Sequence, residues 1–259
     1  MNDAFDPSND PGDPLPYSKE TEDERLLANI AELDEIGRNS WRIFRIMGEF
    51  VEGFERLGHI GTAVSFFGSA RTTPDDPMYH QCVETARLLG EAGFPIITGG
   101  GPGMMEAANK GAQLAGVPSI GCNIELPFEQ ASNPYLDHDI DFRYFFVRKT
   151  MFVKYACAFV IFPGGYGTMD ELFEALTLIQ TSKIRNFPVV LFDSSYWSGL
   201  IHWLRDTMQP QGKIATADLD LLFVTDDPEA AARHITDRHA QYLSREAHRF
   251  CRRRTDQTG

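Results

Sequence analysis

Short apolar runs alternate with stretches of helical periodicity along most of this chain. After Gly58 the apolar runs are short and bounded by glycine, proline or polar clusters, which is typical of buried strands. We expect strands at 63–67, 94–98, 117–122, 142–147, 157–162, 189–192 and 221–224. We expect helices at 78–90, 104–115, 148–155, 172–180, 197–208 and 228–242. This alternation predicts an α/β fold, a doubly wound parallel sheet with helices on both faces.

The pattern also divides the chain into parts. Residues 1–16 are rich in Asp, Asn and Pro and are expected to be a disordered tail. Residues 17–60 are expected to form an N-terminal helical extension, 61–242 the α/β domain, and 243–259 a basic C-terminal tail. The loop at 126–139 should separate two strands.

The helical extension carries an apolar stripe of the i, i+3, i+4, i+7 kind. Its members are Trp41, Phe44, Ile46, Met47, Phe50, Val51, Phe54 and Leu57. The stripe either packs on its own domain or buries a contact with a second subunit. We expect a homo-oligomer, a dimer or larger, with the stripe in the contact.

Composition narrows the class of partner. The chain has 259 residues and a net charge of −13, which argues against a nucleic-acid partner because phosphate backbones bind basic surfaces. A small phosphorylated ligand stays possible, since a few local donors can hold it. No stretch approaches the roughly 18 apolar residues of a membrane span, and no signal segment is evident, so we expect a cytoplasmic protein without a membrane partner. The four cysteines are scattered, and we expect no metal site and no cofactor.

Three glycine-rich turns follow expected strands, at 68–71, 99–103 and 163–168. The carboxyl ends of parallel strands share one edge of the sheet, where ligands bind. Glycine lets backbone N–H groups approach an anion, and a helix N-terminus favours negative charge. The three turns therefore predict a crevice for a phosphate or nucleotide.

Two charged groups border this crevice. Glu171 follows the third turn and has two interpretations: the partner of Thr168 in a helix capping box, or a carboxylate with a chemical role. Arg148 comes directly after the expected aromatic strand, so it should lie on the same edge, with Lys149 beside it. A guanidinium recognises phosphate or carboxylate in a planar, bidentate manner.

Two common nucleotide motifs are absent. The dinucleotide fingerprint G-x-G-x-x-G fits neither candidate turn, because Met104 and Asp170 stand where its third glycine belongs. The P-loop G-x-x-x-x-G-K-[ST] does not occur.

The segment from Pro163 through Gly164, Gly165, Tyr166, Gly167 and Thr168 to Glu171, with Arg148-Lys149 before it, resembles the Lonely Guy (LOG) family. Its members are cytokinin riboside 5′-monophosphate phosphoribohydrolases, often mislabelled lysine decarboxylases. The resemblance covers roughly residues 62–239, and the first 60 residues look like those of the longer bacterial forms. It implies a Rossmann-like fold and hydrolysis of the N-glycosidic bond of cytokinin or adenosine nucleoside 5′-monophosphates, giving free base and ribose 5-phosphate.

Carried over by motif, the resemblance places the catalytic pair at Arg148 and Glu171. The substrate-binding positions that it implies, together with the second glycine turn, are Gly99, Gly100, Gly101, Gly103, Glu129, Lys149, Gly164, Gly165, Tyr166, Gly167, Thr168, Met169, Asp170 and Thr177. The match at Glu129 is loose. The chain departs from the plant enzymes in having Phe145-Phe146-Val147 before Arg148 rather than a polar Met-His-x segment. Whether the base is a prenylated adenine or adenine itself stays open.

Two alternatives remain to be weighed. The first is a non-catalytic nucleotide or molybdenum-cofactor carrier, which would need the glycine cradle but not the Arg148–Glu171 pair. The second is a pyridoxal-phosphate amino-acid decarboxylase. Such enzymes carry a His-Lys pair, and none of the six lysines here follows a histidine, so we reject it.

Overall fold

The structure, a computed structural model, describes residues 21–27, 34–126 and 131–255, the side chains of 34–40 and 248–255 excepted. The expected disordered tail at 1–16 and the candidate Glu129 lie outside the described residues. In the described part, no helix combines the length and apolar content that a membrane crossing requires.

The centre of the molecule is a seven-stranded sheet in which every neighbouring pair is parallel. Its strands are β1 (Ala63–Phe67), β2 (Ile96–Thr98), β3 (Ser119–Ile124), β4 (His138–Phe142), β5 (Ala156–Ile161), β6 (Val189–Phe192) and β7 (Leu222–Thr225). They lie in the order β4-β3-β2-β1-β5-β6-β7. The chain thus runs outward from β1 to one edge and returns to β5 to build the other half. This doubly wound, Rossmann-like α/β sheet confirms the predicted fold class.

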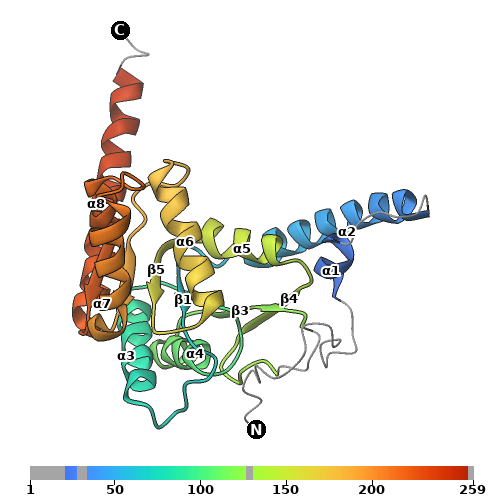
Figure 1. The fold of residues 1–259 in the computed structure, drawn as a ribbon, viewed down its shortest axis with the longest axis horizontal. Helices are drawn as coiled ribbons and strands as arrows, with labels where there is room; N and C mark the ends of the chain where they lie inside the picture. The colour runs from blue at the N-terminus through green and yellow to red at the C-terminus, as the bar shows by residue number, and fades with distance from the viewer. Residues whose placement is uncertain (1–20, 28–33, 127–130, 256–259) are drawn as a thin grey trace.

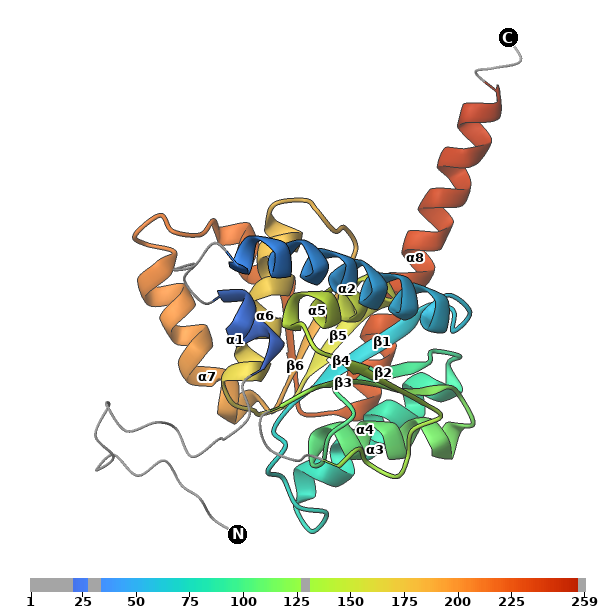
Figure 2. The same ribbon diagram turned by 90° about the vertical axis from the view of Figure 1, so that its right-hand side faces the viewer.

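Helices cover both faces of the sheet (Figures 1 and 2). One face carries α3 (Pro77–Glu91), α4 (Met104–Ala115) and α8 (Pro228–Thr255); the other carries α2 (Asp34–Leu57), α5 (Phe145–Lys154), α6 (Tyr166–Gln180) and α7 (Ser194–Trp203). Strand residues alternate between the two cores, as the period of two requires. In β1, Ala63 and Phe67 belong to one core cluster, and Val64 and Phe66 to the other. Both faces are therefore buried, which explains the continuous apolar runs in the sequence.

The prediction of a strand at 142–147 was wrong. The strand in this region is β4, which ends at Phe142, and α5 begins at Phe145. β4 is an edge strand that buries only Ile140 and Phe142, with His138 half-buried and Asp139 and Asp141 exposed. The aromatic run after it has strand propensity, but tertiary contacts place it in the first turn of a helix.

Other boundaries also differ. α6 begins at Tyr166 rather than at 172, so the helix starts within the segment expected to form the third glycine turn. α7 continues into a π-helical turn at Leu204–Met208, followed by a 3₁₀ helix at Thr216–Leu221. α8 continues past the expected end at Tyr242 to Thr255, and its last turns project from the body of the molecule (Figure 1).

The N-terminal extension contains α1 (Glu22–Leu27) and the long helix α2, which extends outward beside α5 (Figure 1). The apolar stripe of α2 divides into two faces. Ile46, Phe50 and Leu57 pack against the core of the same chain. A second face is exposed; it comprises the stripe members Trp41, Phe44, Met47, Val51 and Phe54, together with Ile43. Docking on the chain's own domain therefore accounts for part of the stripe only.

Because part of the stripe is exposed, we still predict that the protein self-associates through this surface. Phe44 is 62% exposed and its ring contact is with Trp41, which is itself exposed. Replacing Phe44 with Glu should therefore lower the mass measured by light scattering with little change in melting temperature. Phe50→Glu is the matched control, and it should lower the melting temperature because it places a charge against the core. A monomeric wild type, or an unchanged mass for Phe44→Glu, would refute the prediction.

Candidate functional site

The three glycine-rich turns meet at one point on the carboxyl edge of the sheet. This point lies between β1 and β5, where the strand order reverses, the usual place of a ligand crevice in such folds. The turns are hydrogen-bonded to one another through Ser69, whose N–H donates to the Pro163 carbonyl at 2.9 Å. The Ser69 carbonyl accepts from the Met104 N–H at 3.0 Å. The backbone of all three turns is thus held in a single unit.

The turn after β5 needs glycine at Gly164. A Cβ there would lie 2.1 Å from Thr168 Oγ1 and 3.0 Å from the Gly68 carbonyl carbon, so a side chain would push the turns apart. The Tyr196 hydroxyl of α7 donates to the Gly164 carbonyl at 2.6 Å and fixes the turn from the other side. α6 then begins without a capping side chain, because Gly165 is its N-cap residue.

The turn after β2 is fixed from behind. The Asn133 side-chain amide donates to the carbonyls of Gly100 and Gly101, each at 3.0 Å. It also donates to Asn109 Oδ1 at 2.9 Å, within a buried polar network that includes Thr98. Gly100 and Gly101 therefore support the turn, and only Gly99 reaches the crevice.

The turns enclose a cavity of about 540 Å³. Its walls are Phe67, Gly68, Ser69, Ala70, Arg71, Gly99, Met105, Phe145, Arg148, Gly165, Tyr166, Gly167, Thr168, Asp170 and Glu171. Polar groups gather at the N-terminus of α6, whereas Met105 and Phe145 supply apolar surface. The cavity therefore offers both polar and apolar contacts to a small ligand.

Arg148 reaches the cavity from α5, sandwiched between aromatic rings. Its guanidinium carbon lies 5.1 Å from the centre of the Phe152 ring and 5.9 Å from that of Phe145. A Cβ on Gly99 would come within 2.7 Å of Arg148 Nη2, so the glycine leaves room for the guanidinium. Its Nε is buried and has no hydrogen-bond partner among the described residues. Burial lowers the pKa of Arg148, and the negative charge of Glu171 partly offsets this effect.

Glu171 enters from the second turn of α6. The capping-box interpretation was wrong, because Thr168 lies inside the helix and Gly165 is the N-cap. Glu171 is buried, and its Oε1 lies 3.3 Å from Lys149 Nζ. Its Oε2 is buried and has no hydrogen-bond partner in the part of the chain that the structure describes. Burial raises the pKa of Glu171 from 4.5 to about 7, although Lys149 acts to lower it. The carboxyl group is therefore poised to change charge near neutral pH.

Lys149 faces the acidic side of α6 instead of lining the cavity. Its ammonium lies 2.9 Å from Asp170, 3.3 Å from Glu171 and 2.6 Å from Glu174. Burial alone would lower the pKa of Lys149, but its hydrogen bonds to Glu174 and Asp170 outweigh burial and raise it. The lysine is thus fully charged and holds three carboxylates together beside the cavity.

The cavity gathers eight of the predicted site residues and omits others. It includes Gly99, Arg148, Gly165, Tyr166, Gly167, Thr168, Asp170 and Glu171. Gly100, Gly101, Gly103, Gly164, Lys149 and Met169 adjoin the turns or α6 without lining the cavity. Thr177 lies further along α6, exposed, with its hydroxyl donating to the Phe173 carbonyl.

The cavity-lining residues that the sequence-based prediction missed are Phe67, Gly68, Ser69, Ala70, Arg71, Met105 and Phe145. The turn at 68–71 was recognised as one of three on the same edge, and that signal pointed to Ser69 and Arg71. Arg71 is exposed at the cavity and forms no ion pair with any described residue. Phe145 was hidden by its assignment to a strand.

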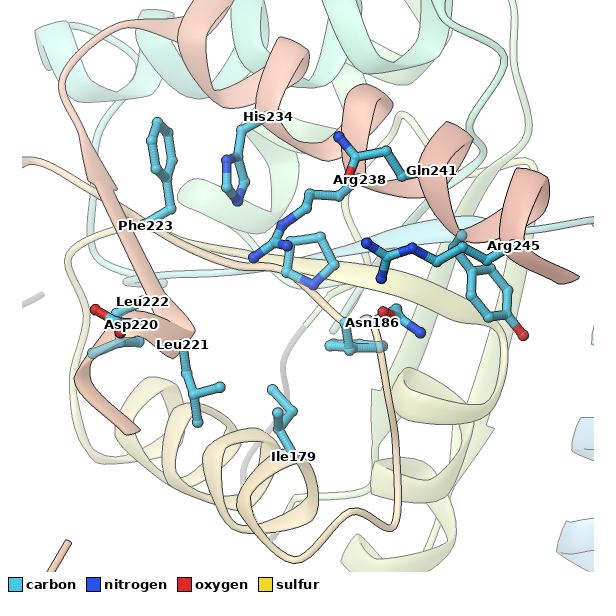
Figure 3. A pocket seen from close by; sticks show the side chains of 13 residues that line it. Ile179, Asn186, Asp220, Leu221, Leu222, Phe223, His234, Arg238, Gln241 and Arg245 are labelled. Carbon is cyan, nitrogen blue, oxygen red and sulfur yellow. The ribbon is translucent and has the colours of Figure 1, made fainter. Parts of the chain in front are cut away.

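A second cavity lies at the opposite edge of the sheet, among residues that precede β6 and β7 and one face of α8 (Figure 3). Its volume is about 230 Å³. Figure 3 shows Arg238 and Arg245 extending over it, while His234 stacks on Phe223 with ring centres 4.0 Å apart. Asp220 is the one carboxylate among its lining residues and is exposed, so this cavity has no counterpart of the buried Glu171.

Solved structures share this architecture. A structural-genomics protein named TM1055 superposes with a TM-score of 0.53 at 22% identity, covering 68% of this chain and 99% of that one. The molybdenum cofactor carrier protein of Chlamydomonas reinhardtii superposes with a TM-score of 0.50 at 22% identity, covering 70% of this chain and 99% of its own. At this identity both likenesses establish the fold alone.

Two sequence relatives of this chain are named for the same enzymatic activity. The cytokinin riboside 5′-monophosphate phosphoribohydrolase of Mycobacterium tuberculosis is 28% identical over 167 residues, which is 61% of this chain and 87% of the relative. A rice protein named "Probable cytokinin riboside 5′-monophosphate phosphoribohydrolase LOG4" is 29% identical over 185 residues, or 70% of this chain and 78% of its own. A family model described as "Possible lysine decarboxylase" matches residues 105–235, slightly more than half of the sequence. The glycine turns, Arg148 and Glu171 of the family motif also lie together at one edge of a Rossmann-like sheet. The chain therefore belongs to the Lonely Guy (LOG) family.

Proposed function

We propose that this protein hydrolyses the N-glycosidic bond of adenosine-type nucleoside 5′-monophosphates, releasing the free base and ribose 5-phosphate. The observation that carries this proposal is a pair of buried polar atoms beside one cavity, Arg148 Nε and Glu171 Oε2, which have no hydrogen-bond partner among the described residues. Native proteins seldom leave such groups unsatisfied, because each costs about 1–3 kcal/mol when buried without a partner. A ligand that needs both groups would explain why they are kept.

The N-terminus of α6 is the proposed phosphate site. Its first turn carries Tyr166, Gly167 and Thr168, and no side chain caps its free N–H groups. These groups and the helix dipole favour an anion at this point. Arg71 lies at the same cavity with its guanidinium unpaired among the described residues, and it would add a second contact. In this role the phosphate anchors the substrate and lets binding energy position the sugar.

Glu171 is the proposed catalytic carboxylate. When the bond between the base and C1′ of the ribose breaks, its electron pair leaves with the base and positive charge develops on the sugar. Glu171, one turn further along α6 than the phosphate site, would stabilise this charge and take a proton from the water that attacks C1′, as carboxylates do in glycosidases. That proton then passes to the departing base, which is released in its neutral form. The raised pKa of Glu171 suits a group that accepts a proton near neutral pH.

Arg148 is the proposed electrophilic partner. Its guanidinium is flanked by the Phe145 and Phe152 rings and forms no ion pair with Glu171 or any other described carboxylate. It stays charged because an arginine does not lose its proton in proteins. An unpaired fork of donors in this position would hold the phosphoribosyl group in register with Glu171.

The same observations weigh against the carrier alternative. A carrier must release an intact ligand and gains nothing from a buried carboxyl group with a pKa near neutrality. The structural similarity to a molybdenum cofactor carrier concerns the fold, and the Arg148–Glu171 arrangement favours chemistry. Assays on the isolated protein distinguish the two functions directly.

We expect turnover of AMP but not of adenosine. The reason is that the first turn of α6 binds a phosphate, and a nucleoside lacks this anchor. A panel of nucleoside 5′-monophosphates, including a prenylated adenosine monophosphate, is incubated with the enzyme and assayed for free base and ribose 5-phosphate. Equal turnover of adenosine and AMP would contradict the phosphate site, and binding of AMP without release of base would support a carrier.

Glu171→Gln should lower kcat by roughly 100-fold or more, on the scale of general acid–base catalysis, with a smaller effect on AMP affinity. The amide keeps the shape of the side chain but cannot stabilise positive charge or accept a proton. Arg148→Lys should act similarly, because a point charge does not reproduce the guanidinium fork. Asp170→Asn is a matched control, because Asp170 is exposed and pairs with the same lysine, Lys149. This variant should lose far less activity than Glu171→Gln. A folded Glu171→Gln enzyme that keeps most of its turnover would remove this residue from the mechanism.

The raised pKa of Glu171 also predicts two pH dependences. Because the ionised form is the proposed active one, kcat/KM should rise with pH to a plateau, with an apparent pKa near 7. The folded-state pKa lies above the unfolded value of 4.5, so the stabilising contribution of Glu171 is complete below about pH 4.5 and is lost as pH rises to about 7. Thermal melts should therefore show Glu171→Gln gaining stability relative to wild type between pH 5 and pH 8. A constant difference in melting temperature would show that this carboxyl group does not titrate in that range.

A further inference from the structure

The first turn of α5, which leads into Arg148, is not capped by its own part of the chain. Tyr144 is the N-cap residue of α5, and its side chain makes no capping hydrogen bond. The first hydrogen bond of the helix runs from the Arg148 N–H to the Tyr144 carbonyl at 3.2 Å. The N–H groups before Arg148 therefore need partners from elsewhere.

One partner is Glu49, a buried carboxylate on α2. Its two oxygens accept from the Arg143 N–H, both at 3.2 Å, and Oε2 also accepts from the Tyr144 N–H at 3.4 Å. The Arg143 side chain lies 3.9 Å from the same carboxylate. Burial raises the pKa of Glu49, and these N–H groups act against that rise. The carboxylate sits where the dipole of α5 favours negative charge.

A second partner is Asp23 on α1. Its Oδ2 accepts from the Phe145 N–H, the first residue of α5, at 3.1 Å. The neighbouring Glu22 accepts from the Tyr144 hydroxyl at 3.4 Å and pairs with Arg45 of α2 at 3.1 Å. Both helices of the N-terminal extension thus contribute an acid to the same helix start.

α2 also packs closely along α5. Gly53 faces Met151, and a Cβ at Gly53 would come within 2.8 Å of Met151 Cε. The Tyr155 hydroxyl at the end of α5 donates to the Phe54 carbonyl at 3.3 Å. The start and the end of α5 are therefore both tied to α2, with Arg148 between these contacts. The guanidinium itself makes no hydrogen bond through Nε that could fix it independently.

We propose that Glu49, with Asp23, is a positioning residue of the active site: it fixes the first turn of α5 and thereby sets where the Arg148 guanidinium lies. This inference rests on the proposed function for its kinetic consequence. The N-terminal extension then serves the reaction through α5, independently of any role of its exposed apolar face.

The kinetic test uses Glu49→Ala and Glu49→Gln in the full chain. Glu49→Ala removes both acceptors and should lower kcat by about tenfold to 100-fold, the scale of a small misplacement of a catalytic group, with KM for AMP changed less. Glu49→Gln keeps one acceptor oxygen and should restore much of this loss. Glu55→Ala is the matched control, because Glu55 is exposed on the same helix and has no ion pair with a described residue; it should behave as wild type.

A double variant separates positioning from general stabilisation. If Glu49 acts through the guanidinium fork, Glu49→Ala should reduce kcat far less in an Arg148→Lys background than in wild type. The proposal would be overturned if Glu49→Ala lowered kcat by the same factor in both backgrounds, or if Glu49→Ala kept full activity.

Hydrogen exchange gives a readout that does not depend on activity. The amides of 143–147 should exchange at least about tenfold faster in Glu49→Ala than in wild type, whereas those of α3, on the other face of the sheet, should be unchanged. Unchanged exchange at 143–147 would refute the positioning role even if activity fell. If the wild type releases no base from any monophosphate, the proposed function fails, while this exchange result still decides whether Glu49 fixes α5.

Discussion

The close approach of three backbone turns at the reversal of strand order is the constraint on which the site depends. Ser69 is hydrogen-bonded to both neighbouring turns, and Gly164 has no room for a side chain. The turns can meet only because β1, β2 and β5 are parallel and adjacent, so that their carboxyl ends share one edge. The same packing leaves the start of α6 uncapped and open to the cavity. The fold and the proposed anion site thus depend on one arrangement of the backbone.

Charge in the site is distributed unequally. Lys149 forms ion pairs with three carboxylates on α6, and it contacts Glu171 through one oxygen only. Arg148, the residue before Lys149 on α5, lies near two aromatic rings and forms no ion pair with a described carboxylate. A direct Arg148–Glu171 ion pair would satisfy both groups and lower the pKa of the acid. Their separation leaves each available to a ligand and keeps the carboxyl group near its titration point.

Much of this could be predicted from the sequence, because the signals are local. The buried strands have continuous apolar runs, and the glycine turns have few structural alternatives. The start of α5 could not be predicted, since Phe145 and Phe146 have strand propensity and the groups that cap the helix are distant in sequence, at Asp23 and Glu49. The capping box at Thr168 failed for a related reason: the spacing was right, but the helix begins two residues before Thr168, at Tyr166. Burial and pairing of charged side chains depend on contacts that no local pattern contains.

The loss of the capping role changes how Glu171 is to be understood. A capping carboxylate would stabilise the helix and need no other explanation. The structure instead shows a buried acid whose pKa is raised, which means that ionising it destabilises the folded state at neutral pH. Replacing it with a neutral side chain would be the simplest route to a more stable protein. Proteins keep such unfavourable groups where function requires them, and a carboxylate that faces developing positive charge is one such requirement. The energetic cost at Glu171, more than any resemblance of motif, is therefore the physical argument for catalysis over carriage.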